Sequence, residues 1–160
     1  MELGNQLLVI WHSRTRASEQ MAKSAASHQG AKLMPADQVQ TEHLIDAAGY
    51  LFVGPENLGS LSGAMKEMFD RNYYSVLGQI EGRPYASIIA AGSDGEGAQR
   101  QLDRIVTGWR LKRVADPMIV NFAAQEPEAI IAIKTPSLDI LKQCEDLGNG
   151  LCEGLGLGLF

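Results

Sequence analysis

Short apolar runs alternate with amphipathic stretches along most of this chain. The first run, residues 7–11, is too short for a typical helix and predicts a buried strand. Between residues 17 and 26, apolar positions at helical spacing with polar residues between them predict a helix. The alternation continues and predicts further strands at 31–34, 50–53, 84–91 and 114–120, and further helices at about 41–47, 61–74, 97–111 and 137–154.

Strands that alternate with helices in this way predict a parallel sheet covered by helices on both faces. We therefore expect a single α/β domain over residues 1–160, a three-layer sandwich with five parallel strands in the order 2-1-3-4-5. Ligands of such folds bind beyond the carboxyl ends of the strands. The segments that follow strands one, three and four are accordingly the candidate binding loops.

These three segments are rich in small or hydroxyl-bearing residues. They are Ser13-Arg14-Thr15-Arg16-Ala17-Ser18, Gly54-Pro55-Glu56-Asn57-Leu58-Gly59-Ser60 and Gly92-Ser93-Asp94-Gly95-Glu96-Gly97. In the first, hydroxyls and the unpaired N–H groups of a helix start can hold a phosphate, and the two arginines can add charge-assisted bonds. In the second, backbone N–H groups and the Asn57 amide can bond the polar edge of a flat ring system.

Each segment alone also fits an ordinary strand-to-helix loop, in which a single residue only caps a helix: Ser18 in the first, Ser60 or Ser62 in the second and Asp94 in the third. Their coincidence at one sheet edge favours a ligand site. The first loop lacks Gly-x-Gly-x-x-Gly, Gly-Lys-Ser/Thr and a nearby acidic pair, which argues against a dinucleotide site, a P-loop and a phospho-acceptor domain. Such a loop suits a phosphate that is held but not transferred, as in a flavin mononucleotide.

The composition narrows the possible partners and compartment. A net charge of −5 argues against a general nucleic-acid binder, and no apolar run approaches the ~20 residues of a membrane helix. The start, Met1-Glu2-Leu3-Gly4, lacks the basic residues of a signal peptide. Cys144 and Cys152 stand eight residues apart on a predicted helix, too far for a disulfide, and no cysteine–histidine cluster suggests a metal site. We expect a cytoplasmic protein with free thiols, without nucleic-acid or membrane partners.

The three loops resemble those of a known family. The chain is similar to flavodoxin-like proteins, close to the NAD(P)H-dependent FMN reductases and WrbA-type quinone reductases. The first loop resembles the flavodoxin phosphate loop, hydroxyl-x-Thr-Gly-x-Thr, with Arg16 where flavodoxins usually carry glycine. The second loop, with Ser62-Gly63-Ala64-Met65-Lys66 and Phe69-Asp70-Arg71 after it, resembles the flavin-ring loop and helix of these reductases, and residues 91–95 resemble the loop after strand four.

The resemblance implies FMN as the cofactor, NAD(P)H as co-substrate and a homo-oligomer. FMN would lie against residues 13–18, 55–60 and 92–95. The cluster of Met65, Met68, Phe69, Tyr73 and Tyr74 either supplies an oligomer surface or is buried within one subunit.

Two classes of function fit this reading. In the first, FMN accepts hydride at N5 from NAD(P)H and passes electrons to a small-molecule acceptor such as a quinone, nitro compound, flavin or metal chelate, with no acid–base residue required. In the second, the protein is a non-enzymatic electron carrier. The second loop lacks the Thr-Arg-Phe of quinone reductases and has no stacking aromatic, and an open ring face suits hydride transfer. Basic residues between 100 and 113 either bind an NADPH phosphate or complement a helix dipole, and Arg16 is a candidate contact for an anionic second substrate.

Overall fold

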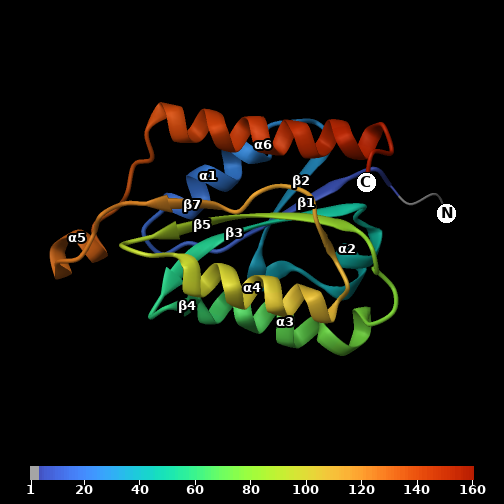
Figure 1. The fold of residues 1–160 in the computed structure, drawn as a ribbon, viewed down its shortest axis with the longest axis horizontal. Coiled ribbons are helices and arrows are strands. Elements are labelled where there is room, and N and C mark those ends of the chain that lie inside the picture. The colour runs from blue at the N-terminus through green and yellow to red at the C-terminus, as the bar shows by residue number, and fades with distance from the viewer. Residues whose placement is uncertain (1–3) are drawn as a thin grey trace.

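A parallel sheet forms the centre of the computed structural model, which describes residues 4–160 (Figure 1). Its strands are β1 (Leu7–Trp11), β2 (Ala31–Pro35), β3 (Gly49–Asn57), β5 (Pro84–Ala91), β6 (Lys112–Arg113) and β7 (Met118–Asn121). Their spatial order is β2-β1-β3-β5, and β6 and β7 share the fifth position because both pair with β5 in parallel. The expected α/β sandwich and strand order are confirmed. The prediction that the chain has no signal peptide rests partly on residues 1–3, which lie outside the described residues.

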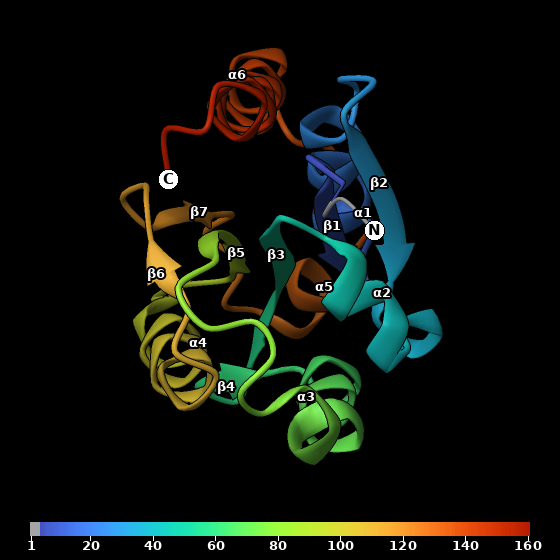
Figure 2. The same ribbon diagram turned by 90° about the vertical axis from the view of Figure 1, so that its right-hand side faces the viewer.

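Helices cover both faces of this sheet, which is therefore the middle of three layers (Figure 2). The covering helices are α1 (Ala17–Ala25) and α6 (Leu138–Gly156) on one face, and α3 (Gly63–Val76) and α4 (Glu96–Gly108) on the other. Successive residues of a strand point to opposite faces. Leu7 and Val9 accordingly pack with residues of α1 and α6, whereas Leu8 and Ile10 pack with residues of α3 and α4.

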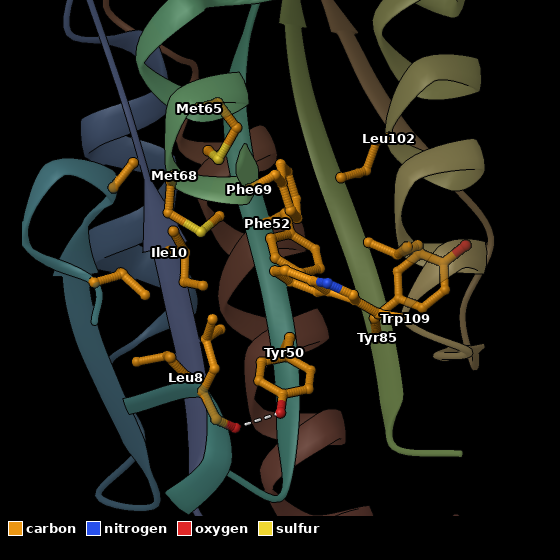
Figure 3. Packing of buried hydrophobic residues seen from close by; sticks show 14 of the residues in the cluster. Leu8, Ile10, Tyr50, Phe52, Met65, Met68, Phe69, Tyr85, Leu102 and Trp109 are labelled. Atoms are coloured by element: carbon orange, nitrogen blue, oxygen red, sulfur yellow. Dashed lines mark hydrogen bonds between the residues drawn. The ribbon is translucent and has the colours of Figure 1, made fainter. Parts of the chain in front are cut away.

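Aromatic side chains fill the layer between the sheet and α3 and α4 (Figure 3). The ring of Phe69 lies 5.2 Å from that of Phe52 and 5.2 Å from that of Trp109. The Tyr50 hydroxyl donates to the carbonyl of Leu44 in α2 (Thr41–Asp46), which follows a 3-10 turn, η1 (Ala36–Gln38). Within the predicted Met-Phe-Tyr cluster, Met65, Met68 and Phe69 are buried, whereas Tyr73 and Tyr74 are exposed.

Two predicted strands have different bounds in the structure. The predicted strand at 50–53 continues to Asn57 as β3. Pro55 is tolerated in it because β1 ends opposite Val53, so no β1 carbonyl is left without a partner by the missing N–H of Pro55. The fifth strand is split into β6 and β7 around residues 114–117. Pro117 has no N–H to offer a ladder, so the chain leaves the sheet there and rejoins it at Met118.

Both cysteines lie in α6 and form no disulfide. Cys144 and Cys152 are buried free thiols, and burial raises the pKa of Cys144 to about 11, so its thiolate form is scarce. Among residues 4–160, no helix combines the length and apolarity needed to cross a bilayer. Within the same residues, no three His, Cys, Asp or Glu side chains gather into a group that could hold a metal ion.

Candidate functional site

A cavity of about 900 Å³ opens at the carboxyl edge of the sheet. It brings together the three predicted loops, and among the predicted site residues Arg16, Asp94 and Gly95 do not line it. The cavity also has walls that the sequence analysis missed. These further lining residues are Leu61, Gly63, Ala90, Ala91, Phe122, Ala124, Ile130 and Lys134.

The phosphate loop, residues 13–18, joins β1 to the start of α1. Ser13, Thr15 and Ser18 all line the cavity. The hydroxyl of Ser18 is buried, the residue being 1% exposed, and it has no hydrogen-bond partner among the described residues. A buried polar atom normally has a partner, so this hydroxyl fits a ligand oxygen placed in the cavity. The adjoining N–H groups of the α1 start favour an anion at the same place.

Arg16 is the residue that departs from the flavodoxin loop. It precedes α1 in a left-handed conformation, with φ 68°, which explains why flavodoxins usually carry glycine at this position. It does not line the cavity, and its guanidinium pairs with the carboxylate of Glu19 at 3.3 Å. Its carbonyl accepts bonds from the main-chain N–H and the side-chain amide of Gln20.

The second loop contains a β-hairpin, which the sequence analysis did not predict. β3 pairs antiparallel with β4 (Ser60–Leu61) across a two-residue turn, Leu58-Gly59, in which both φ angles are positive, 51° and 73°. Such turns prefer Asn-Gly or Asp-Gly, so Leu-Gly gave no hairpin signal. Leu58 is fully exposed at the tip beside the cavity. We call residues 54–61 the ring hairpin.

Glu56 fastens the ring hairpin to the start of α4. One carboxylate oxygen accepts the N–H of Gly95 at 2.8 Å, and the other accepts the N–H of Ala98 at 3.0 Å. Gln101 of α4 also accepts the N–H of Leu61 at 2.7 Å. Asp94 provides no side-chain cap for α4, contrary to the simple loop interpretation, because Glu56 supplies the acceptor from another loop. Glu56, which the sequence predicted to contact the cofactor, lines the cavity, and its two carboxylate oxygens accept backbone N–H groups.

A second side-chain contact joins the end of β1 to the start of α3. Nδ1 of His12 lies 2.8 Å from the hydroxyl of Ser62, which also accepts the N–H of Met65 as the α3 cap. Burial lowers the pKa of His12, and the positive charge of Arg14 lowers it further, while Asp37 acts in the opposite direction. At neutral pH the ring is therefore uncharged, and this pair fixes the phosphate loop relative to the ring hairpin.

An exposed segment of the chain forms the remaining wall. Residues 125–133, which we call the arm, are all exposed and include α5 (Pro127–Ile131) (Figure 1). Both ends of the arm are tied to cavity loops: the N–H of Ala124 donates to the carbonyl of Gly92, and that of Lys134 donates to the carbonyl of Thr15, each at 2.8 Å. None of the predicted helices and strands falls between residues 121 and 136, although Pro127 at a helix start followed by isoleucines was a usable signal.

This fold and cavity define a class: a flavodoxin-like α/β protein with a cavity at the carboxyl edge of its sheet, lined by a hydroxyl-rich loop and a hairpin. The family model of the NADPH-dependent FMN reductases matches residues 34–125, more than half of the chain. The chain therefore belongs to this family.

Individual proteins similar to this chain are named flavodoxins. A protein named flavodoxin from Aquifex aeolicus (strain VF5) is 27% identical over 165 aligned residues, which cover 95% of this chain and 88% of that protein. Similar solved structures include a flavodoxin from the domain Archaea (TM-score 0.75, 14% identity, 94% of this chain and 99% of that one). A WrbA-like flavodoxin from Agrobacterium tumefaciens is equally similar (TM-score 0.75, 14% identity, 95% and 98%). At such identities the solved structures show the shared fold.

The cavity fits the cofactor that the family implies. The phosphate loop offers hydroxyls, including the unpartnered one of Ser18, and the N–H groups of a helix start, which together suit a phosphate monoester. The volume of about 900 Å³ lies within the usual range of ligand cavities. Family and cavity together support an FMN-binding flavoprotein.

Proposed function

We propose that the protein is an FMN-dependent oxidoreductase that takes reducing equivalents from NAD(P)H and passes them to a small-molecule acceptor. The observation that carries this proposal is the composition of the cavity wall. The ring hairpin has Leu58 at its tip, and among the described lining residues Phe122 is the aromatic one. The proposal follows because a ring held by the hairpin backbone, without an aromatic from that hairpin stacked on it, keeps a face accessible to a second substrate.

The protein's own part in this chemistry is to bind and orient. When bound, FMN supplies the redox chemistry by accepting a hydride and releasing electrons to the acceptor. The hydroxyls of Ser13, Thr15 and Ser18 would hold the phosphate, and the ring hairpin would offer backbone N–H groups and the Asn57 amide to the ring. The Glu56 bonds to α4 keep that hairpin in one position, so the ring would meet a rigid wall.

A second candidate function, an electron carrier without its own NAD(P)H reaction, has a specific observation in its favour. Asp94, Glu126 and Glu128 are exposed acidic residues on the third loop and the arm, next to the cavity. Acidic groups around a redox site steer a basic protein partner by electrostatic attraction. The relative named flavodoxin is consistent with such a role.

We also propose a homo-oligomer, in which a neighbouring subunit helps to close the cavity. Its support is the set of exposed apolar side chains near the cavity mouth, Leu58, Ile130 and Ile131. Analytical ultracentrifugation decides this point, and a monomer at micromolar concentration would contradict it.

One set of measurements separates the enzyme from the carrier. The absorbance spectrum of the purified protein and the mass of the released flavin establish whether FMN is bound. Steady-state oxidation of NADPH, and in parallel of NADH, with a quinone as acceptor then tests turnover. Bound FMN with catalytic NAD(P)H oxidation supports the enzyme, whereas bound FMN without it favours the carrier. A protein that binds no FMN when supplied with it contradicts both.

A further inference from the structure

Hydrogen bonds join the end of the arm to the phosphate loop. The N–H of Lys134 donates to the carbonyl of Thr15 at 2.8 Å. The side-chain amide of Gln20 donates to two carbonyls, that of Arg16 at 3.0 Å and that of Lys134 at 2.8 Å. Gln20 therefore lies between the loop and the end of the arm and binds both.

The arm depends on these bonds because it has little else to hold it. Residues 125–133 are all exposed, and α5 contains no buried residue. The ammonium of Lys134 donates to the carbonyls of Ala129, Ile130 and Ala132, so α5 is fastened mainly to Lys134. The position of Lys134 in turn is set by Thr15 and Gln20.

The same bonds also fix the phosphate loop. A trans peptide group is planar, so the carbonyl of one residue determines the direction of the next residue's N–H. Holding the carbonyl of Thr15 fixes the N–H of Arg16. The carbonyl of Arg16 is held by the main-chain N–H and, in addition, by the side-chain amide of Gln20, and this fixes the N–H of Ala17. These two N–H groups lie at the helix start, where an anion is bound by backbone donors. The left-handed backbone of Arg16 makes the second restraint important, since that conformation is strained for a residue with a side chain.

We propose that Gln20 is a positioning residue that fixes the arm to the phosphate loop, so that the arm's order and the loop's affinity for a phosphate-bearing ligand depend on the same two hydrogen bonds. The part that concerns the ligand rests on the proposed FMN site. The part that concerns the arm stands without any ligand. Ile130 of the arm and the nearby Phe122 line the cavity. The electron acceptor would therefore contact a wall whose position depends on the bonds between Gln20 and the phosphate loop.

The test compares the wild-type protein with Gln20→Leu and Gln20→Glu. Leucine removes both side-chain bonds and leaves the bond from the main-chain N–H of Gln20 to the Arg16 carbonyl. Glutamate has nearly the same shape but presents a charged acceptor to two carbonyl oxygens. Gln143→Leu is the matched control, because Gln143 also lies on a helix and donates only to the exposed Asp139. Circular dichroism and thermal unfolding show that each variant is folded.

The first readout is hydrogen exchange of the ligand-free protein. The N–H groups of Ile130, Ala132 and Lys134 are hydrogen-bonded and report on the arm. Their exchange should rise about fivefold for each hydrogen bond that Gln20→Leu removes, and more in Gln20→Glu. Gln143→Leu should match the wild type. Arm exchange that is the same in Gln20→Leu and the wild type overturns the proposal, whether or not the protein binds a flavin.

The second readout is the dissociation constant for FMN and for riboflavin, measured by fluorescence titration. Loss of the Gln20 bonds should weaken FMN at least fivefold and leave riboflavin unchanged, because riboflavin has no phosphate. Equal weakening of both flavins contradicts a link to the phosphate loop. If no variant and no wild-type protein binds FMN, the proposed function fails, while the exchange measurement still decides whether Gln20 holds the arm.

Discussion

The carboxylate of Glu56 and the backbone N–H of Gly95 lie 2.8 Å apart, although the two residues are separated by 39 positions in the chain. A side chain of the ring hairpin thus completes the start of α4, a role usually filled by the residue that precedes a helix. Gly97 lies so close to the hairpin that a Cβ there would come within 2.2 Å of the Gly59 carbonyl oxygen. The second and third loops consequently form one rigid wall of the cavity.

Removing the Glu56 carboxylate should destabilise this wall. Glu56→Ala leaves the N–H groups of Gly95 and Ala98 without their acceptor, and we expect the free energy of unfolding to fall by about 2 kcal/mol in urea denaturation. Glu96→Ala is the control, because Glu96 lies on the same helix and only pairs with exposed Arg100 at 3.6 Å, a contact worth at most about 1 kcal/mol. Equal losses of stability in the two variants would show that the Glu56 hydrogen bonds do not stabilise the fold.

Replacing Ser18 should have opposite effects on the free and the flavin-bound protein. The unpartnered buried hydroxyl is costly in the ligand-free state, so Ser18→Ala should raise its stability by about 1 kcal/mol. The same change removes a hydrogen bond to a charged group, so FMN affinity should fall roughly tenfold or more. Ser24→Ala, on the same helix but outside the cavity wall, should change neither quantity appreciably.

The triple change of Ser13, Thr15 and Ser18 to alanine extends this test to the whole cradle. We expect FMN affinity to fall by at least about two orders of magnitude, since each lost bond to a charged group is worth about 1.5–3 kcal/mol. Flavin content of the purified variant gives the answer directly. A triple variant that still copurifies with a full complement of flavin would place the phosphate elsewhere.

Arg16 offers a test of backbone strain. Arg16→Gly should stabilise the protein by about 1 kcal/mol, because glycine adopts φ 68° without a steric penalty. Arg16→Ala keeps the strain and should bring no such gain. It also tests the contact with an anionic second substrate that the sequence suggested: a raised KM for NAD(P)H would support that contact. An unchanged KM would agree instead with the observed pairing of Arg16 with Glu19.

The lowered pKa of His12 predicts a loss of stability in mild acid. The unfolded chain takes up a proton on this ring near pH 6.5, whereas the folded protein does so only at lower pH because of burial and Arg14. The contribution of His12 is therefore complete above pH 6.5 and is lost as the pH falls from there toward the folded pKa. The melting temperature of His12→Gln should decline less between pH 8 and pH 5 than that of the wild type. Parallel declines would mean that other groups account for the acid sensitivity.

Local patterns in the sequence were enough for the phosphate loop and for most of the sheet. The apolar run of β1, the hydroxyls after it and the stripe on α1 are contiguous, so the position of Ser13, Thr15 and Ser18 follows from neighbouring residues. The ring hairpin was missed because Leu58 occupies a turn position where asparagine would have been the signal. The same short-range view led to the wrong expected end of β3.

Long-range contacts account for the remaining differences. Nothing near Glu56 in the sequence indicates that its carboxylate binds the start of α4, because the partner residues become neighbours only when β3 and β5 pair. The arm is similar: Lys134 and Thr15 come together only once the chain has crossed the sheet edge. Composition identifies which residues can hold a ligand, and the pairing of distant strands determines which of them have other partners.

Because the arm is attached at both ends, its sequence and length can change without disturbing the rest of the fold. Residues 125–133 bury nothing in the core, and the flanking Ala124 and Lys134 bind the carbonyls of Gly92 and Thr15 in the cavity loops. Doubling the length of such a loop costs only about 0.6 kcal/mol in closure entropy. Evolution and protein engineers alike are therefore free to lengthen, recharge or reshape this segment, and so to redirect the cavity toward new acceptors, while the sheet and the phosphate loop keep the same sequence.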